Sequence, residues 1–323
     1  MSEGSFMTKP RILVLAWLPD GLLPQLAARF PEYDWTDARD PAAFEQHLAA
    51  ATIVYGLPPV ARVSEMAALR WIQLPWAGVP QELCPVAQAR NVTVTNLAGL
   101  YGPSIAEHAF ALLTTLSRNL HAALRNQAQR RWDRGVAKQM IDLHGRTLAV
   151  IGLGDVGRGI ARLGRAYGMR VVGCRRTDAP TPGVDQVYPC KELRAMLGEA
   201  DVVAVAAPLT AATAGMLGAD EFAAMKCGVL YVNVSRGAIA QEAALLDALQ
   251  RGHVAGAGLD VFAVEPLPPE HPFWTMPQVI VSPHYSGETV NQSARPAERF
   301  ARNLAAWADG RELEGLVNLA AGY

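Results

Sequence analysis

Four side chains with catalytic potential follow three apolar, strand-like runs in the second half of this chain. Arg236 follows "VLYVNVS", Asp260 and Glu265 follow "VAGAGL", and His284 follows "VIVSP". An imidazole exchanges protons near neutral pH, and a guanidinium binds a carboxylate through two parallel hydrogen bonds. Because ligands bind beyond the carboxyl ends of the strands in an open α/β sheet, we expect these groups to converge on one cleft. Such a set suits proton transfer to an anionic substrate.

A glycine-rich turn lies upstream of these residues. Gly152, Gly154 and Gly157 follow the apolar run "TLAVI" and open the helical pattern "VGRGIARLGRAYG". Between a strand and a helix, this GxGxxG spacing is the dinucleotide-binding fingerprint, in which the turn glycines let the backbone approach a pyrophosphate. The amides and dipole at the start of the helix favour the phosphate charge. We therefore predict a nicotinamide dinucleotide site.

The end of the next predicted strand indicates which dinucleotide binds. An acidic residue there would bind a ribose 2′-hydroxyl, whereas an arginine accommodates a 2′-phosphate. This chain has Arg175, Arg176 and Thr177, beginning 23 residues after Gly152. A guanidinium at that point attracts a phosphate that a carboxylate would repel. The sequence favours NADP(H) over NAD(H), with Asp178 left as an alternative acidic partner and one of the two arginines open to a purely solvated role.

The elements that position these residues follow an alternating strand–helix pattern, which is typical of parallel α/β units. In the first half we predict strands at 11–17, 51–56, 71–79 and 91–96, and helices at 21–30 and 64–70. A long helical stretch at 104–132 starts with a capping box formed by Ser104 and Glu107. Further strands are predicted at 147–152, 170–174, 202–208, 229–235, 254–260 and 279–284, before a final helix at 289–310.

We therefore expect an α/β fold of two domains. A Rossmann dinucleotide-binding domain at 102–287 is inserted in a smaller, flavodoxin-like α/β substrate domain formed by 1–101 and 288–323. With 323 residues the chain is long enough for two such cores.

Composition excludes several classes of protein. The 29 basic and 30 acidic residues nearly cancel, which argues against nucleic acid as a partner. No apolar run reaches the about 18 residues of a membrane span, and the N-terminus lacks a signal-peptide pattern. Cys84, Cys174, Cys190 and Cys227 are scattered, so we expect buried, reduced thiols in a cytoplasmic protein. No residues show the spacing of a metal site.

Several motifs in a fixed order resemble the D-isomer-specific 2-hydroxyacid dehydrogenases, a family that includes glyoxylate/hydroxypyruvate reductases and phosphoglycerate dehydrogenase. In order they are "WAGV", "AEHAFALLTTLSRNL", "VIGLGDVG", "NVSRGAI", "LDVFAVEPLPPEHPFW" and "SPHYSG". The resemblance covers nearly the whole chain beyond the first few residues. The departure from the common NAD-type pattern is the pair Arg175–Arg176, which bears on the choice of cofactor.

The resemblance implies that Arg236, Glu265 and His284 form the catalytic set. In the reduction of a 2-keto acid, His284 would donate the proton to the carbonyl oxygen. Glu265 would orient the imidazole and favour its charged form. Arg236 would hold the substrate carboxylate and polarise the carbonyl.

Additional contacts are implied by the same resemblance. Cofactor contacts would come from Asp155, Val156, Pro208, Thr213, Val234, Ser235, Asp260 and Gly287, besides the glycines, arginines, Thr177, Arg236 and His284 named above. Pro208, Thr213 and Asp260 could instead be ordinary turn residues. Substrate contacts would come from the backbone at Ala77, Gly78 and Val79 and from Trp76, Tyr101, Arg236 and His284, although Tyr101 could serve only in packing. Apolar faces in the long helical stretch, together with the "HPFW" segment, suggest a homodimer.

Together these inferences predict an NADPH-dependent reductase of small 2-keto acids, which produces D-2-hydroxy acids. Two alternatives stay open. One is an NAD-dependent dehydrogenase of the phosphoglycerate type, for which the two arginines would be incidental. The other is a non-catalytic, dinucleotide-sensing protein of the corepressor kind on the same fold.

Overall fold

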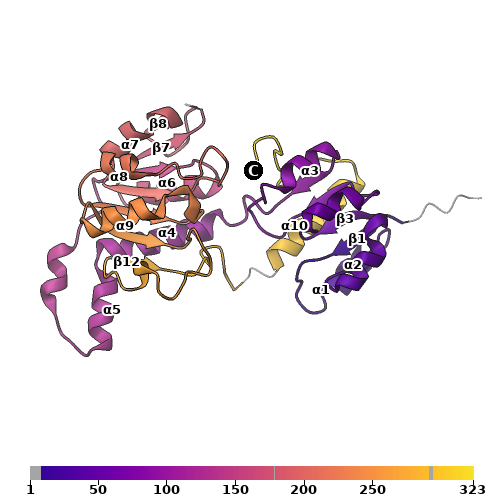
Figure 1. Ribbon diagram of the computed structural model, residues 1–323, viewed down its shortest axis with the longest axis horizontal. Helices are drawn as coiled ribbons and strands as arrows, with labels where there is room; N and C mark the ends of the chain where they lie inside the picture. The colour runs from indigo at the N-terminus through magenta and orange to yellow at the C-terminus, as the bar shows by residue number, and fades with distance from the viewer. Residues whose placement is uncertain (1–8, 178, 291–293) are drawn as a thin grey trace, which may run out of the picture. The chain divides into compact units, whose positions relative to one another are not determined.

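The computed structural model describes residues 9–177, 179–290 and 294–323. Asp178 and the first eight residues therefore lie outside the described part. The chain divides into two compact units, one formed by 1–100 and 289–323 and the other by 101–288. The described residues contain a five-stranded sheet in the first unit and a seven-stranded sheet in the second, and every strand pairing in both is parallel. The α/β class predicted from the alternating pattern is confirmed (Figure 1).

The smaller sheet has the strand order β2-β1-β3-β4-β5, which is the flavodoxin-like order. Its strands are β1 (Arg11–Val14), β2 (Asp34–Asp37), β3 (Ala51–Tyr55), β4 (Trp71–Gln73) and β5 (Thr93–Thr95). The helices of this unit are α1 (Leu22–Arg29), α2 (Pro41–His47), α3 (Leu83–Ala89) and α10 (Ala294–Ala308), with 3-10 turns η1 (Leu48–Ala50) and η2 (Val60–Glu65). Neighbouring side chains on β1 face opposite ways, Leu13 into one core cluster and Ile12 and Val14 into another.

The larger sheet has the order β12-β11-β10-β9-β6-β7-β8, which is the doubly wound Rossmann order extended by one strand. Its strands are β6 (Thr147–Ile151), β7 (Arg170–Arg175), β8 (Gln186–Pro189), β9 (Val202–Val205), β10 (Val229–Asn233), β11 (Val254–Leu259) and β12 (Val279–Val281). Its helices are α4 (Gly102–Ser117), α5 (Leu120–Ala128), α6 (Asp155–Ala166), α7 (Leu193–Glu199), α8 (Ala219–Ala224) and α9 (Glu242–Gln250). The 3-10 turns are η3 (Arg134–Gln139), η4 (Cys190–Glu192), η5 (Gly237–Ile239) and η6 (Pro272–Trp274).

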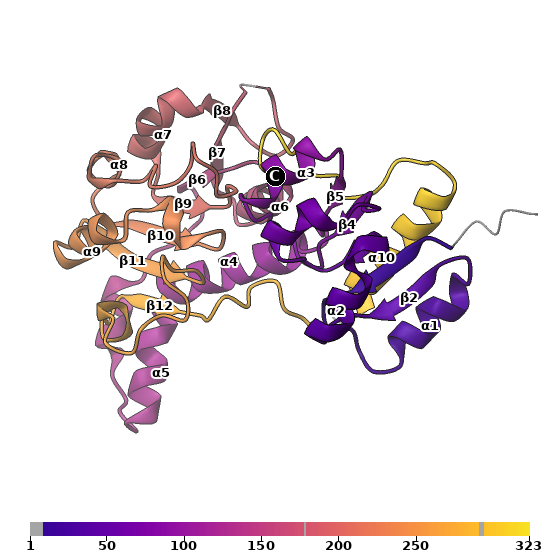
Figure 2. The same cartoon turned by 45° about the vertical axis from the view of Figure 1, so that its right-hand side comes forward.

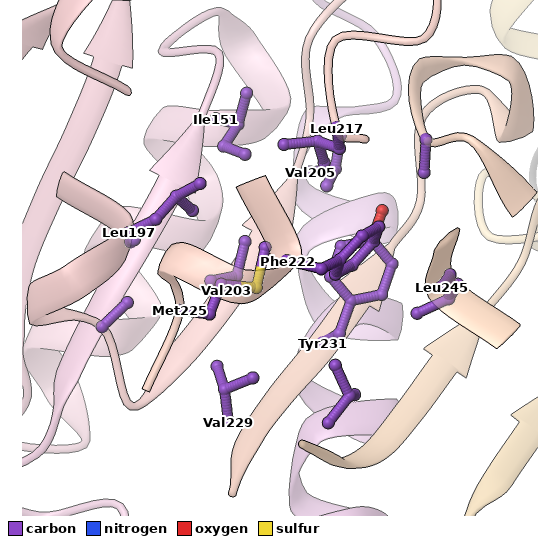
Figure 3. Close-up of a cluster of buried hydrophobic side chains, with 14 of the residues drawn as sticks. Ile151, Leu197, Val203, Val205, Leu217, Phe222, Met225, Val229, Tyr231 and Leu245 are labelled. Atoms are coloured by element: carbon purple, nitrogen blue, oxygen red, sulfur yellow. The ribbon is translucent and has the colours of Figure 1, made fainter. Parts of the chain in front are cut away.

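Helices cover both faces of the larger sheet, as the view in Figure 2 shows. Ala149 and Ile151 of β6 pack with α7, α8 and α9, whereas Leu148 and Val150 pack with α4 and α6. The first of these clusters surrounds Tyr231 and is drawn in Figure 3. Burying each large aliphatic or aromatic side chain of this kind contributes about 1.5–3 kcal/mol. Two apolar layers therefore hold the strand ends rigidly in place.

Several local predictions were wrong. Residues 64–70 do not form a helix, since η2 ends at Glu65. The predicted capping box is also wrong. Helix α4 already begins at Gly102 with Pro103 in its first turn, and it has no side-chain cap. The long helical stretch breaks at Asn119, whose φ of 52° lies in the left-handed region, and continues as α5.

The cysteine prediction was wrong for half of its residues. Cys84 and Cys174 are buried, but Cys190 and Cys227 are exposed. Strands β2 and β8 were missed. Both lie at an edge of their sheet and carry less buried residues than the central strands, so their sequences lack a continuous apolar run.

Candidate active site

The carboxyl ends of β10, β11 and β12 bring three of the predicted catalytic residues into one region of the second unit. Nδ1 of His284 lies 2.6 Å from Oε2 of Glu265, and the backbone N–H of Phe262 donates to Oε1 of the same carboxylate at 2.9 Å. Both Glu265 oxygens are therefore engaged. Because Nδ1 is held by the carboxylate, the Nε2 atom of His284 is the ring nitrogen left for a substrate.

Arg236 stands beside this pair. Its Nη1 donates to its neighbour's carbonyl, Ser235 O, at 2.6 Å. Burial lowers the pKa of Arg236, and the nearby Glu265 carboxylate opposes that change. A guanidinium nevertheless stays charged in proteins. The residue after Arg236 is Gly237, which lies directly against the backbone of Phe262. A Cβ at position 237 would lie 2.0 Å from that backbone, so the close packing of these two segments requires glycine. A half-buried cation next to a carboxylate–imidazole pair is suited to an anionic ligand.

The loop that carries His284 is organised by Asp260, which is fully buried at the end of β11. Its carboxylate accepts the N–H groups of Tyr285 and Ser286 at 3.2 and 3.0 Å, and its carbonyl accepts that of His284 at 2.8 Å. His284 itself has a φ of 52°. A histidine in this left-handed region costs free energy, and such strain persists at functional sites where the surroundings enforce it. Asp260 supplies that enforcement.

A further histidine, which the sequence analysis missed, supports Asp260. Ser282 Oγ donates to Asp260 Oδ1 at 2.6 Å, and His108 Nε2 lies 2.9 Å from Ser282 Oγ. Since the single hydroxyl proton of Ser282 points to Asp260, His108 must donate its Nε2–H. Burial lowers the pKa of His108, although the Asp260 charge opposes this. The His108 imidazole is thus a positioning group at the end of a hydrogen-bonded chain that leads through Ser282 and Asp260 to the His284 loop.

The glycine-rich turn fits a dinucleotide. Gly152 has a φ of 92°, and a Cβ on it would lie 2.6 Å from the backbone of Ala207. A Cβ on Gly157 would lie 1.8 Å from Gly152 O, which shows how closely α6 packs on the turn. At Gly154 nothing lies within 4 Å of the added atom, so space is open where a pyrophosphate would approach. These are the three roles that the fingerprint assigns to its glycines. Asp155 and Val156 form the first turn of α6, and the Asp155 carboxylate lies against Gly102.

The residues predicted for the adenosine end lie along β7 and the turn after β9. Arg175 ends β7, and its Nη1 is 3.5 Å from Thr181 Oγ1, the outer limit of a hydrogen bond. Arg176 and Thr177 are exposed beyond it, while the alternative acid Asp178 lies outside the described residues. Thr213 is used within its own turn, since its hydroxyl donates to Pro208 O at 2.6 Å and accepts the N–H of Thr210 at 2.8 Å.

The other predicted contacts have defined local roles. Val234 and Ser235 are buried after β10, where Ser235 Oγ donates to Asn233 Oδ1 at 2.9 Å. A Cβ on Gly287 would meet the Tyr101 ring at 3.4 Å, so this buried tyrosine packs on the end of the His284 loop. In the first unit, Trp76 is 40% exposed. The N–H groups of Ala77, Gly78 and Val79 donate to no other residue in the described ranges, which leaves three amides for an anion.

A pocket of about 540 Å³ beside α6 contains cations that the sequence analysis missed. It is lined by Gly102, Pro103, Asp155, Arg158, Gly159, Arg162, Arg165, Pro182 and Gly183. Arg165 pairs with Asp185 at 2.7 Å, but neither Arg158 nor Arg162 contacts a carboxylate among the described residues. The sequence could have indicated these cations, because Arg158 and Arg162 are four residues apart on a helix that begins at the glycine turn. This spacing places both side chains on one face of the helix.

Comparison with known proteins identifies the family. The family profile described as "D-isomer specific 2-hydroxyacid dehydrogenase, NAD binding domain" matches residues 110–286, more than half of the chain. This chain belongs to that family. The sequence resemblance is thereby confirmed, and the Rossmann unit of this 2-hydroxyacid dehydrogenase is its NAD-binding domain.

The relatives to which this chain is similar have different activities. A glyoxylate reductase of Korarchaeum cryptofilum is 33% identical, with 96% of each chain covered. A D-3-phosphoglycerate dehydrogenase of Bacillus subtilis is also 33% identical over 94% of this chain, which spans only 57% of that protein. An NADPH-dependent glyoxylate/hydroxypyruvate reductase of Sinorhizobium meliloti, solved with NADP and malonate, superposes with a TM-score of 0.80 at 31% identity, covering 97% of this chain and 98% of that one.

Two further findings on the described residues concern membrane-spanning helices and clusters of metal-binding side chains. None of their helices is both long and apolar enough to cross a bilayer. No group of three or more His, Cys, Asp or Glu side chains within these ranges could hold a metal ion.

Proposed function

We propose that this 2-hydroxyacid dehydrogenase reduces small 2-keto acids to D-2-hydroxy acids with NADPH. The observation that carries the proposal is the contact of 2.6 Å between His284 Nδ1 and Glu265 Oε2, made next to the half-buried Arg236. When bound, the reduced nicotinamide supplies the hydride. The residues of this chain bind and orient the substrate and manage the proton.

The proton goes to the carbonyl oxygen from His284. With Nδ1 held by Glu265, the imidazolium presents Nε2–H as the donor, and the carboxylate stabilises the charged ring before transfer. Arg236 binds the substrate carboxylate through its planar fork. In the first unit, the amides of Ala77, Gly78 and Val79 offer a second set of donors for an anionic group. Asp260 and Tyr101 keep the His284 loop in place, and Asp260 is also proposed to contact the nicotinamide amide.

The choice of NADPH rests on the end of β7. Arg175 has no carboxylate partner among the described residues, and Arg176 and Thr177 follow it at the surface. Two adjacent guanidinium groups favour a 2′-phosphate at this end of the cofactor. The S. meliloti relative, whose solved complex contains NADP, supports this choice.

The proposal is tested with a panel of glyoxylate, hydroxypyruvate, pyruvate and bulkier 2-keto acids, each assayed by oxidation of NADPH and of NADH. We expect turnover of at least one acid, with kcat/KM at least about tenfold higher for NADPH. Equal or better use of NADH would overturn the cofactor assignment. The B. subtilis relative makes 3-phosphoglycerate oxidation with NAD the second candidate, so that reaction belongs in the same panel.

Replacing both Arg175 and Arg176 by alanine should reverse the preference for NADPH over NADH. The double variant loses two cations that attract the 2′-phosphate, each charge-assisted contact being worth about 1.5–3 kcal/mol. We expect KM for NADPH to rise about 10²-fold, while KM for NADH changes by less than about threefold. The matched control is Arg194→Ala, since Arg194 is an exposed arginine of the same unit that pairs with Asp220 and Glu221. If the ratio of KM for NADPH to KM for NADH is unchanged in the double variant, the assignment of NADPH as the cofactor is contradicted.

We further propose that the protein is a homodimer that assembles through α5 and the segment after it. Helix α5 extends from the rest of the second unit in both views (Figures 1 and 2). It exposes Leu120 and Leu124, Trp132 beyond it is 94% exposed, and Trp274 is exposed in the "HPFW" segment. Several large apolar side chains exposed on one unit are the feature that supports this interface between copies.

A further inference from the structure

Two of the four cysteines meet at the edge of the cofactor-binding unit. Cys174 is buried near the end of β7, and Cys190 is exposed as the first residue of η4. Their sulfur atoms are 3.4 Å apart. Strands β7 and β8 pair in parallel, with Arg175 opposite Pro189, and this pairing brings the two thiols together. Cys84 and Cys227 have no cysteine neighbour among the described residues.

The environments of the two thiols differ. Cys190 is open to solvent and therefore accessible to a small oxidant. Cys174 lies in the apolar cluster around Tyr188, Leu193 and Leu197, which shields it. Burial raises the pKa of Cys174, and its contact with Cys190 adds to that rise. An exposed thiol beside a shielded one is the arrangement of an attacking and a resolving cysteine.

We propose that Cys174 and Cys190 are a reversible oxidation site that forms an intrachain disulfide with a peroxide and thereby weakens cofactor binding. The Cys190 thiolate attacks one peroxide oxygen, the O–O bond breaks, and a sulfenic acid and hydroxide result. The Cys174 sulfur then attacks the sulfenic sulfur and displaces its hydroxyl group. The protons of both thiols leave with the two oxygens, so two thiols and one hydrogen peroxide give one disulfide and two waters. A dithiol reductant reverses the reaction by exchange.

The link to the cofactor runs through the backbone of Cys174. A disulfide bond is about 2.05 Å long, so the two sulfurs must approach each other by about 1.3 Å. The carbonyl of Cys174 accepts the N–H of Gly152, the first glycine of the phosphate turn, at 2.9 Å. Arg175 and Arg176 follow Cys174 directly. A shift of Cys174 therefore acts on both ends of the proposed dinucleotide site, and in this respect the inference rests on the proposed function.

The test compares reduced and oxidised full-length protein. After treatment with one equivalent of hydrogen peroxide, non-reducing peptide mapping by mass spectrometry should find Cys174 linked to Cys190. The Kd for NADPH, measured by fluorescence titration, should rise about tenfold and return after treatment with dithiothreitol. Cys190→Ser should bind NADPH normally and resist the peroxide effect. Cys227→Ser is the matched control, because Cys227 is also exposed but stands alone, and it should respond like the wild type.

Two results would overturn the inference. One is a peptide map without the Cys174–Cys190 link, for example with Cys190 converted to a sulfinic acid. The other is a linked protein whose Kd for NADPH is unchanged. The map does not depend on the cofactor, so it separates this inference from the proposed function. A reduced protein that prefers NADH contradicts only the cofactor assignment, and the peroxide effect is then measured on the Kd for NADH through the Gly152 turn.

Discussion

Replacing His284 by asparagine should lower kcat for 2-keto acid reduction by about 10²–10⁴-fold, the usual contribution of a positioned general acid. Asparagine is the most informative replacement because it tolerates the left-handed backbone of position 284, where φ is 52°. The loop held by Asp260 should therefore keep its conformation. The Kd for NADPH should change by less than about threefold, since the phosphate turn is untouched.

The control for this variant is His253→Asn. His253 lies in the same unit, and its Nε2 is 3.0 Å from Met225 O, away from the residues around Glu265. It should keep nearly wild-type kcat. A His284→Asn protein that binds NADPH and reduces keto acids at the wild-type rate contradicts the role of His284 as the general acid. A wild-type protein that binds NADPH but turns over none of the keto acids favours the dinucleotide-sensing alternative.

Glu265→Gln gives an independent measure of the same pair. Glutamine still accepts a hydrogen bond from Nδ1 but removes the charge that stabilises the imidazolium. Residues that act as a unit are not additive. The double variant with His284→Asn should therefore be little slower than His284→Asn alone, whereas a merely structural role for Glu265 predicts multiplied losses.

The sequence was sufficient to predict the convergence of the site because parallel strands end on one edge of a sheet. Arg236, Asp260, Glu265 and His284 follow three neighbouring strands, so their proximity is a consequence of strand order. The glycine turn was predictable for a similar reason, since its three glycines are defined by local backbone geometry. Both predictions rest on short segments of sequence. In the structure, β10, β11 and β12 are neighbours and the turn glycines make the expected close contacts.

Features that depend on distant partners could not be predicted in this way. His108 and Ser282 are 174 residues apart, and nothing near His108 in the sequence marks its hydrogen bond. The Cys174–Cys190 contact depends on β8, an edge strand with too few buried residues to be recognised. The break at Asn119 within an apparently continuous helical pattern depends on its side chain, whose Nδ2 donates to Val136 O at 2.9 Å. Each of these features depends on contacts between residues that are distant in the sequence, which the local sequence pattern does not show.

Arg236→Lys should reduce kcat/KM for keto acids by about 10²–10³-fold, comparable to the loss of one donor to a developing oxyanion. Lysine keeps the positive charge but lacks the planar fork that holds a carboxylate with two parallel hydrogen bonds. It also places a strongly hydrated ammonium at a position where burial already disfavours charge, as the lowered pKa of Arg236 indicates. We expect the loss to be measured in both kcat and KM, because the residue binds the substrate and orients its carbonyl.

Added guanidinium ion separates this role from a structural one. In Arg236→Ala, the side chain is removed and a cavity is left beside Glu265, which a free guanidinium can enter because the two charges attract. Partial recovery of kcat/KM with guanidinium, but not with equal concentrations of ammonium, is the expected result. Arg118→Ala is the matched control, since Arg118 is an exposed arginine paired with Asp142 at 3.1 Å and should show neither loss nor rescue. If Arg236→Lys retains more than about half of the wild-type kcat/KM, the guanidinium does not bind the substrate carboxylate and the anion is held elsewhere. The next candidates are the amides of Ala77, Gly78 and Val79, which have no hydrogen-bond acceptor among the described residues.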